Sequence, residues 1–165
     1  MRSSVQFTSA RAAVSERFPM DTPAAAFVVG NSRSGTTMMG RILGRHPAIR
    51  MFRELHFYEE LWSPDAGSAS WSDPQAVELA ATLLSTEREG YMAQRDTDRW
   101  REEAQRLVAA LPSAARGPEQ VYSAFLAGEL ERGGKSIACE QTPRNVFYLP
   151  QIRDLFAQLL VIEMV

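Results

Sequence analysis

The stretch of sequence that decides the fold is residues 24–37, which read AAAFVVGNSRSGTT. Six apolar residues come first and are closed by Gly30, a pattern typical of a parallel strand that is buried on both faces. A polar loop from Asn31 to Gly35 follows, and apolar side chains then recur at helical spacing over residues 38–43. The stretch therefore predicts a strand, a tight loop and a helix in immediate succession.

The same loop has the features of an anion-binding site. Gly30 and Gly35 permit a tight turn and let backbone N–H groups approach an anion. The following helix directs its positive end and its free N–H groups at the loop, which favours a bound phosphate. Arg33, Thr36 and Thr37 add a cation and two hydroxyl donors. We therefore interpret residues 30–37 as a phosphate loop; a strand–turn–helix corner that is simply rich in Ser, Thr and Gly is the alternative.

The phosphate loop departs from the Walker A pattern of nucleotide hydrolases. Thr36 stands where that pattern has a lysine, and Arg33 is the nearest cation. A kinase or an ATPase uses the lysine on the β- and γ-phosphates, together with a hydroxyl that binds Mg²⁺. The loop is therefore suited to phosphate binding, and a small kinase is the less favoured function.

Positive charge is concentrated around this loop in a chain that is otherwise nearly neutral. The 18 Lys and Arg residues against 20 Asp and Glu give a net charge of −2, which argues against a nucleic-acid or anionic-membrane partner. Between Gly30 and Phe52, however, there are four arginines and no acidic residue, and Glu54 is the first carboxylate. We expect Arg41 and Arg45 to lie on the exposed face of the helix.

The rest of the chain alternates strands with helices. Short apolar runs predict strands at residues 49–52, 136–139 and 159–162. Apolar side chains at helical spacing predict a helix with Asp73 as its N-cap and further helices that span about 97–111, 118–131 and 146–156. This order predicts an α/β fold in three layers, with a short parallel sheet flanked by helices as in P-loop nucleotide hydrolases.

Composition divides the chain into an arm and a domain. Residues 1–23 are polar and rich in Arg and Ser, so we expect a flexible N-terminal arm. Residues 24–165 form the predicted α/β domain, in which residues 63–134 are a helical insertion. The strand at 159–162 should be central and buried, yet the chain stops at Val165, so we expect a domain that is truncated at its C-terminus.

Several classes of protein are excluded by composition. The single cysteine, Cys139, rules out an internal disulfide framework and a zinc site made of several thiolates. Its place in a predicted strand indicates a small core residue. The sequence contains neither an apolar run long enough to span a bilayer nor the apolar core of a secretion signal. We therefore expect a cytoplasmic protein without membrane contacts.

Three blocks of sequence together resemble the sulfotransferases that use PAPS (3′-phosphoadenosine 5′-phosphosulfate). The blocks are residues 27–37 with 46–47 and 54–55, residues 139–150, and residues 160–165. The second block is similar to the family's Glu-Lys-Thr-Pro segment, and the third is similar to the strand that precedes its Arg-Asp-Pro-Arg segment. The resemblance implies in-line transfer of a sulfuryl group from PAPS to a hydroxyl or amine of an acceptor, with no metal.

The resemblance also implies roles for residues of the phosphate loop. Arg33 would hold the 5′-phosphosulfate and stabilise the leaving oxygen, because a guanidinium stabilises developing negative charge. Ser34, Gly35, Thr36 and Thr37 would cradle the 5′-phosphate.

Glu54 is the candidate general base. It occupies the position of the glutamate that takes the acceptor's proton in the tyrosylprotein and related branches of the family. A carboxylate at the carboxyl end of a parallel strand is also well placed for this role. The alternatives are a surface glutamate paired with Arg50 or Arg53, and a base role for His56, for which a packed or helix-capping position is favoured.

Two departures from the family weaken the expected activity. Gln141 stands where the family has a lysine that contacts the sulfuryl group, so stabilisation of the transition state should be weaker. The family residues that bind the 3′-phosphate follow the strand at 160–165, and no residue of this chain is assigned to that phosphate. We expect weak or no activity, and a non-catalytic sulfotransferase-like interaction module is the alternative.

The sequence says less about the acceptor and the protein partners than about the sulfuryl donor. The acceptor stays open between a small molecule, a glycan and a peptide, and Phe57, Tyr58 and Trp62 are candidates for lining its pocket. An exposed C-terminal strand would also permit self-association through its edge.

Overall fold

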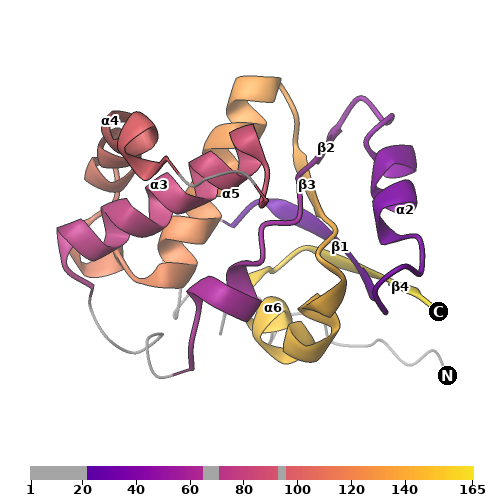
Figure 1. Cartoon of the computed structure of the whole chain (residues 1–165). Coiled ribbons are helices and arrows are strands. Elements are labelled where there is room, and N and C mark those ends of the chain that lie inside the picture. The colour runs from indigo at the N-terminus through magenta and orange to yellow at the C-terminus, as the bar shows by residue number, and fades with distance from the viewer. Residues whose placement is uncertain (1–21, 65–70, 93–95) are drawn as a thin grey trace, which may run out of the picture.

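The structure is a computed structural model that describes residues 22–64, 71–92 and 96–165. Almost all of the predicted N-terminal arm lies outside the described residues. The core is a sheet of four parallel strands in the order β2-β3-β1-β4 (Figure 1). The strands are β1 (Ala24–Gly30), β2 (Ile49–Met51), β3 (Ile137–Glu140) and β4 (Leu159–Met164). The predicted α/β fold with a parallel sheet flanked by helices is confirmed.

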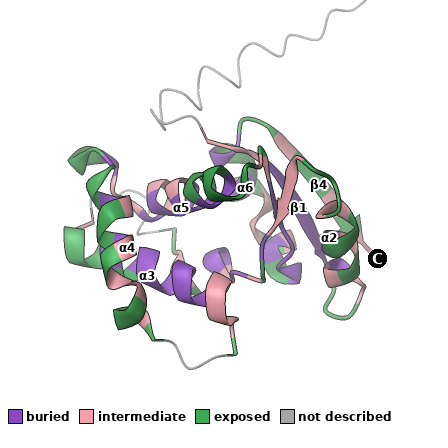
Figure 2. Cartoon of the chain, turned by 90° about the horizontal axis from the view of Figure 1, so that it is seen from above, coloured by how far each residue is buried: buried purple, intermediate pink, exposed green. Residues whose placement is uncertain are grey.

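Side chains of β1 alternate between two apolar layers, which is why a continuous apolar run was needed there. Phe27 and Val29 belong to the larger core cluster, which contains the buried faces of the helices that follow β2. Ala26 and Val28 belong to a smaller cluster with Met39 and other residues of the helix that follows the phosphate loop. Because both faces are covered, β1 is buried between the helices on the two sides of the sheet (Figure 2).

The helices lie on both sides of the sheet (Figure 1). Helix α2 (Thr36–Leu43) covers one face and three long helices lie between β2 and β3 in the chain. These three are α3 (Asp73–Glu89), α4 (Thr97–Ala109) and α5 (Pro118–Gly133). Helix α6 (Leu149–Leu155) precedes β4, and short turns occur at η1 (Phe57–Leu61), η2 (Ser113–Ala115) and η3 (Pro143–Tyr148). All the predicted helices are present.

Two helix boundaries differ from the prediction for local reasons. The N-cap of α3 is Ser72, one residue before the expected Asp73, and its backbone N–H donates to Gln75 Oε1 at 3.0 Å. The helix expected over 146–156 is divided into η3 and α6. Pro150 lacks a backbone N–H and fits only the first turn of a helix, so a new helix starts at Leu149.

Strand β4 does not have the environment that the sequence predicted. It was expected to be central and buried, but it is an edge of the sheet formed by the described residues, and Leu160 is 57% exposed. The reason is that β4 pairs only with β1 among these strands. No helix within the described ranges is long and apolar enough to cross a membrane.

The fold brings the carboxyl ends of β1, β2 and β3 to one edge of the sheet. All strand pairs are parallel, so the segments that follow Gly30, Met51 and Glu140 begin at the same edge. Ligands of open α/β sheets bind outside this edge.

Candidate functional site

The phosphate loop leaves β1 through backbone conformations that favour glycine. Gly30 has a φ of 146°, and a Cβ there would lie 2.2 Å from the carbonyl oxygen of Met164. Gly35 has a φ of 95° and is the N-cap of α2. Arg33 between them has a φ of 71°, an unusual left-handed conformation for a residue with a side chain. The Ser34 N–H closes the turn by donating to the Asn31 carbonyl at 3.1 Å.

The loop presents unsatisfied donors at the start of α2. This helix has no acidic residue in its first turn, so nothing within the turn offsets its positive end. The Ser34 Oγ is buried and has no hydrogen-bond partner in the described part of the chain. Buried hydroxyl groups are nearly always hydrogen-bonded, so this oxygen indicates a site for a further polar group.

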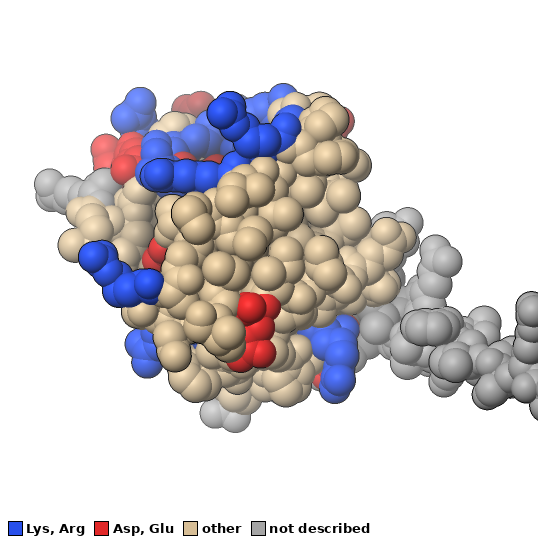
Figure 3. Space-filling view, turned by 90° about the vertical axis from the view of Figure 1, so that its right-hand side faces the viewer, with Lys and Arg blue, Asp and Glu red and all other residues tan. Residues whose placement is uncertain are grey.

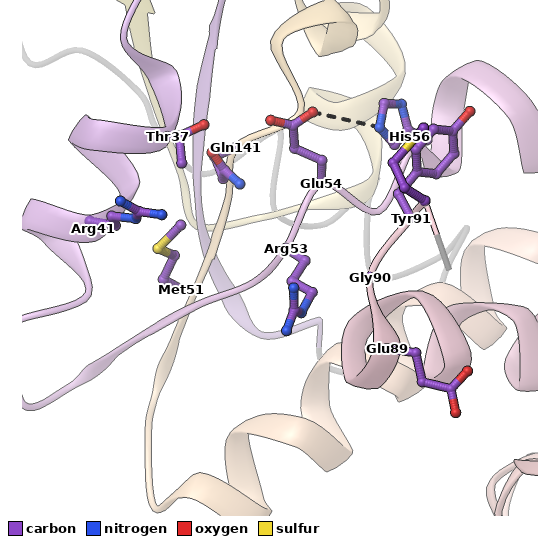
Figure 4. A pocket seen from close by; sticks show the side chains of 11 residues that line it. Thr37, Arg41, Met51, Arg53, Glu54, His56, Glu89, Gly90, Tyr91 and Gln141 are labelled. Atoms are coloured by element: carbon purple, nitrogen blue, oxygen red, sulfur yellow. Dashed lines mark ion pairs between the residues drawn. The ribbon is translucent and has the colours of Figure 1, made fainter. Parts of the chain in front are cut away.

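A cleft of about 610 Å³ lies at the same edge of the sheet (Figure 4). Its walls come from α2, from the segments after β2 and β3, and from the end of α3. The lining residues are Thr37, Arg41, Met51, Arg53, Glu54, His56, Glu89, Gly90, Tyr91, Met92 and Gln141. One cavity therefore joins the end of the phosphate loop to the candidate base.

The carboxylate of Glu54 is about one-third exposed and is paired with a histidine. Its Oε2 lies 3.6 Å from His56 Nε2, and the exposed fraction of its side chain is 35% (Figure 4). The alternative of a surface glutamate paired with Arg50 or Arg53 is wrong, because both guanidinium groups contact Glu87 instead. Glu54 is thus a carboxylate that opens to the cleft and has no arginine partner among the described residues.

His56 lies between two carboxylates. Its Nδ1 is 3.2 Å from Glu59 Oε2, and its ring packs on the ring of Tyr91 with centroids 4.0 Å apart. The expected packed position of His56 is confirmed, but the ring also reaches the cleft. A proton on Nδ1 would leave Nε2 as an acceptor facing Glu54, whereas a doubly protonated ring would donate toward both carboxylates.

The segment that carries Glu54 is fixed from two sides. Phe52 N–H donates to the Cys139 carbonyl at 2.8 Å, which continues the pairing of β2 with β3. Arg53 N–H donates to Glu87 Oε2 of α3 at 2.9 Å. Burial raises the pKa of Glu87, although the Arg53 N–H and the Arg50 guanidinium oppose this. The main chain directly after β2 is therefore held by both the sheet and the helical layer.

Comparison with known proteins agrees with this arrangement. A family model described as "Sulfotransferase family" matches residues 24–165, which is most of the chain. The chain belongs to the sulfotransferase family. Searches of the curated proteins and of the solved structures return no match. Membership supports transfer of sulfuryl groups in general. The geometry of this sulfotransferase indicates which of its residues could take part in the transfer.

The sulfotransferase brings some predicted site residues together and leaves others apart. Thr37 and Glu54 line the same cleft. Thr36 is buried, with 3% of its surface exposed, and Arg33 is exposed on the loop and does not line the cleft. Basic side chains gather along the upper edge of the face that carries α2 (Figure 3). The expected exposure of Arg41 and Arg45 is confirmed, but Arg45 lies beyond the end of α2 at Leu43 and not on the helix.

Gln141 enters the cleft at the position of the family's lysine. It is 4% exposed, and its Oε1 is buried without a hydrogen-bond partner among the described residues. Its side chain packs beside Gly40 of α2, where an added Cβ would lie 3.4 Å away. The amide therefore occupies the space between the phosphate-loop helix and Glu54 (Figure 4).

The expected aromatic lining of the acceptor pocket is wrong for two residues. Phe57 and Tyr58 are 2% and 1% exposed and belong to the core, where Phe57 stacks on Tyr122 with ring centroids 4.0 Å apart. Tyr91 and Met92 line the cleft instead. The sequence signal for them was the glycine at the end of α3, which indicates a chain reversal but not its destination.

No metal site is formed by the part of the chain that the structure describes. In residues 22–64, 71–92 and 96–165, no three His, Cys, Asp or Glu side chains are grouped so that they could hold a metal ion.

Proposed function

We propose that this sulfotransferase transfers a sulfuryl group from PAPS to a hydroxyl or amine acceptor bound in the cleft. The observation that carries the proposal is that the end of the phosphate loop, at Thr37, and the carboxylate of Glu54 line one cavity. A donor site and a base must be adjacent for a proton to leave the acceptor as the sulfuryl group arrives.

The residues present fit the anionic end of PAPS. Gly30 and Gly35 place no side chain in the loop, and α2 offers free N–H groups at its start. Within residues 22–64, 71–92 and 96–165, Ser34 Oγ has no hydrogen-bond partner. We assign the 5′-phosphosulfate to these groups together with Arg33, Thr36 and Thr37. When bound, PAPS supplies the activated sulfuryl group. No residue is assigned to its 3′-phosphate.

Glu54 would accept the proton of the acceptor. Its partial exposure lets a ligand in the cleft reach the carboxylate, and His56 at 3.6 Å restrains it from one side. General base catalysis of this kind contributes about 10²- to 10⁴-fold in rate. The acceptor's chemistry stays open between a small molecule, a glycan and a peptide.

Gln141 favours a second candidate, a sulfotransferase-like module that binds the nucleotide without rapid turnover. An uncharged amide beside the base stabilises developing negative charge less than an ammonium does. Nucleotide binding with little transfer would support this candidate.

Two measurements on the full chain test the proposal. Calorimetry with the desulfated product of PAPS should give saturable binding, which Arg33→Ala weakens at least about tenfold because a charge-assisted hydrogen bond is lost. Arg106→Ala removes an exposed arginine of α4 and serves as the control. Transfer of radiolabelled sulfate from PAPS to a panel of hydroxyl and amine acceptors then separates an enzyme from a binding module. Equal affinity in Arg33→Ala and the native chain would refute the assignment of the loop.

A further inference from the structure

Glu140, at the end of β3, is a buried carboxylate that the proposed reaction does not use. It is 1% exposed and does not line the cleft. Each of its oxygens accepts two hydrogen bonds: Oε1 from Leu55 N at 3.1 Å and from Thr142 Oγ1, and Oε2 from Thr142 N at 3.1 Å and from Asn145 Nδ2. All four acceptor positions of the carboxylate are thus filled by N–H and O–H donors, and no guanidinium of the described part of the chain takes part.

These bonds cross from one strand to its neighbour. Leu55 follows Glu54 in the chain and is 85 residues away from Glu140. The next N–H, that of His56, donates to Thr142 Oγ1 at 3.3 Å, and this hydroxyl in turn donates to Glu140. The backbone N–H groups of Leu55 and His56, which follow the candidate base, are therefore both hydrogen-bonded to the Glu140 carboxylate, the first directly and the second through the Thr142 hydroxyl.

The segment they hold has an unfavourable backbone conformation. His56 has a φ of 51°, a left-handed conformation that is unfavourable for a residue with a side chain unless its surroundings compensate. On the other side of Glu54, the Arg53 N–H is fixed by Glu87. The peptide groups on both sides of Glu54 are thereby held, which sets the direction in which its side chain leaves the chain.

We propose that Glu140 is a positioning residue for the general base, because it holds the backbone of residues 55 and 56 so that Glu54 faces the cleft. It acts through the main chain and touches no ligand. The base role of Glu54 rests on the proposed function, whereas the effect of Glu140 on the backbone does not.

Glu140→Gln tests this proposal against a matched control. The amide keeps the size of the side chain but replaces one acceptor oxygen by a donor and removes the negative charge. The two hydrogen bonds at that oxygen are lost, and those at the remaining oxygen, whichever of Oε1 and Oε2 it is, become weaker. Exchange of the Leu55 and His56 amide hydrogens should become at least about tenfold faster, and kcat should fall about 10- to 100-fold with KM changed less than about twofold. Glu129→Gln changes another buried carboxylate, 2% exposed, that contacts none of residues 52–56. It should lower stability and leave both readouts unchanged in the folded protein.

A second pair of variants isolates the hydroxyl. Thr142→Val should accelerate exchange at His56 more than at Leu55 and should lower kcat, because it removes only the link between the His56 N–H and Glu140. Thr142→Ser retains the hydroxyl and should recover most of the lost rate. If Thr142 only filled space in the core, kcat and the exchange rate of the His56 amide would not depend on whether the side chain at position 142 carries a hydroxyl.

The outcomes are distinct. An unchanged kcat in folded Glu140→Gln overturns the proposal, as does an equal loss in Glu129→Gln at matched stability. If the native chain transfers no sulfuryl group, the proposed function fails, and the exchange rates of the Leu55 and His56 amides alone decide whether Glu140 holds this segment. Unchanged exchange rates in that case overturn the role of Glu140 as well.

Discussion

The helical layer and the phosphate-loop end of the molecule treat their charges in opposite ways. In the helical layer, Glu129 is 2% exposed and contacts Arg50, Arg88 and Arg132 from β2, α3 and α5. Further contacts extend this into an ion network of Arg50, Glu87, Arg88, Glu103, Glu129 and Arg132. At the loop end, by contrast, no carboxylate of the described residues forms an ion pair with Arg33, with Arg41 of α2 or with Arg45 just after α2.

If the proposed function holds, the difference separates charges that serve stability from charges that serve a ligand. A buried carboxylate is tolerated when several donors satisfy it, and the network ties α3, α4 and α5 to the strand that leads to Glu54. An exposed guanidinium group without a carboxylate partner forgoes the stabilisation of an ion pair. Its positive charge is then not neutralised, and the resulting electrostatic potential attracts an anion. Mutations in the two regions should therefore change different measured quantities.

The largest expected effect is on transfer, at the loop end. Glu54→Gln should lower kcat about 10²- to 10⁴-fold with little change in affinity for PAPS or in the free energy of unfolding, because the amide cannot accept the proton. Single-turnover transfer of radiolabelled sulfate measures the rate, and Glu163→Gln, which changes an exposed glutamate of β4, is the control. Equal rates in Glu54→Gln and the native chain would move the base role to His56.

In the helical layer, the expected effect is on folding alone. Glu129→Gln should lower the free energy of unfolding by about 3 kcal/mol, because Arg50 and Arg88 lose their buried partner. Urea denaturation measures this, and Glu102→Gln on the exposed face of α4 should change stability by less than about 0.5 kcal/mol. A loss of transfer in Glu129→Gln that exceeds the loss of folded protein would contradict the separation of the two regions.

Local sequence was sufficient to predict the phosphate-loop end of the molecule. The strand, the loop and the helix at residues 24–43 depend on neighbouring residues, and both glycines of the loop have the positive φ that a tight turn demands. The position of Glu54 followed from the end of a short strand. These features are determined within a few residues of each other, so a pattern could reveal them.

The other contacts depend on packing between distant segments. Glu129 and Arg50 are 79 residues apart, and nothing in either neighbourhood indicates the pairing. Phe57 and Tyr58 were predicted to line the acceptor pocket but pack into the core instead. The sequence did not reveal the left-handed turn at His56 that directly precedes them. The hydrogen bond from Leu55 to Glu140 was likewise not predicted, because it joins segments that are 85 residues apart.

Glu140 sharpens the comparison, because it is buried like Glu129 but has no arginine. Burial raises its pKa from 4.5 to about 6, although bonds from Thr142 and Leu55 oppose the increase. A raised pKa in the folded chain means that the folded state binds the proton more tightly. The stabilisation of the folded state that comes from binding this proton is fully present below about pH 4.5 and is lost as the pH rises through about 6. With roughly 1.4 kcal/mol per pKa unit, native stability relative to Glu140→Gln should fall by about 2 kcal/mol between pH 4 and pH 7. Urea denaturation at several pH values measures this difference, and a constant difference would contradict the raised pKa.

The smallest expected effect tests whether the loop end lacks a charge that transfer needs. Gln141→Lys places an ammonium where a buried amide oxygen has no partner, between α2 and Glu54. Because a cation there would stabilise negative charge as the sulfuryl group moves, kcat should rise about tenfold, with KM for PAPS nearly unchanged. Gln151→Lys is the matched control, since Gln151 in α6 also has a buried, unpartnered Oε1 but does not line the cleft. A rate that stays the same in folded Gln141→Lys would mean that the amide does not limit transfer, and that any slow turnover of the chain originates elsewhere.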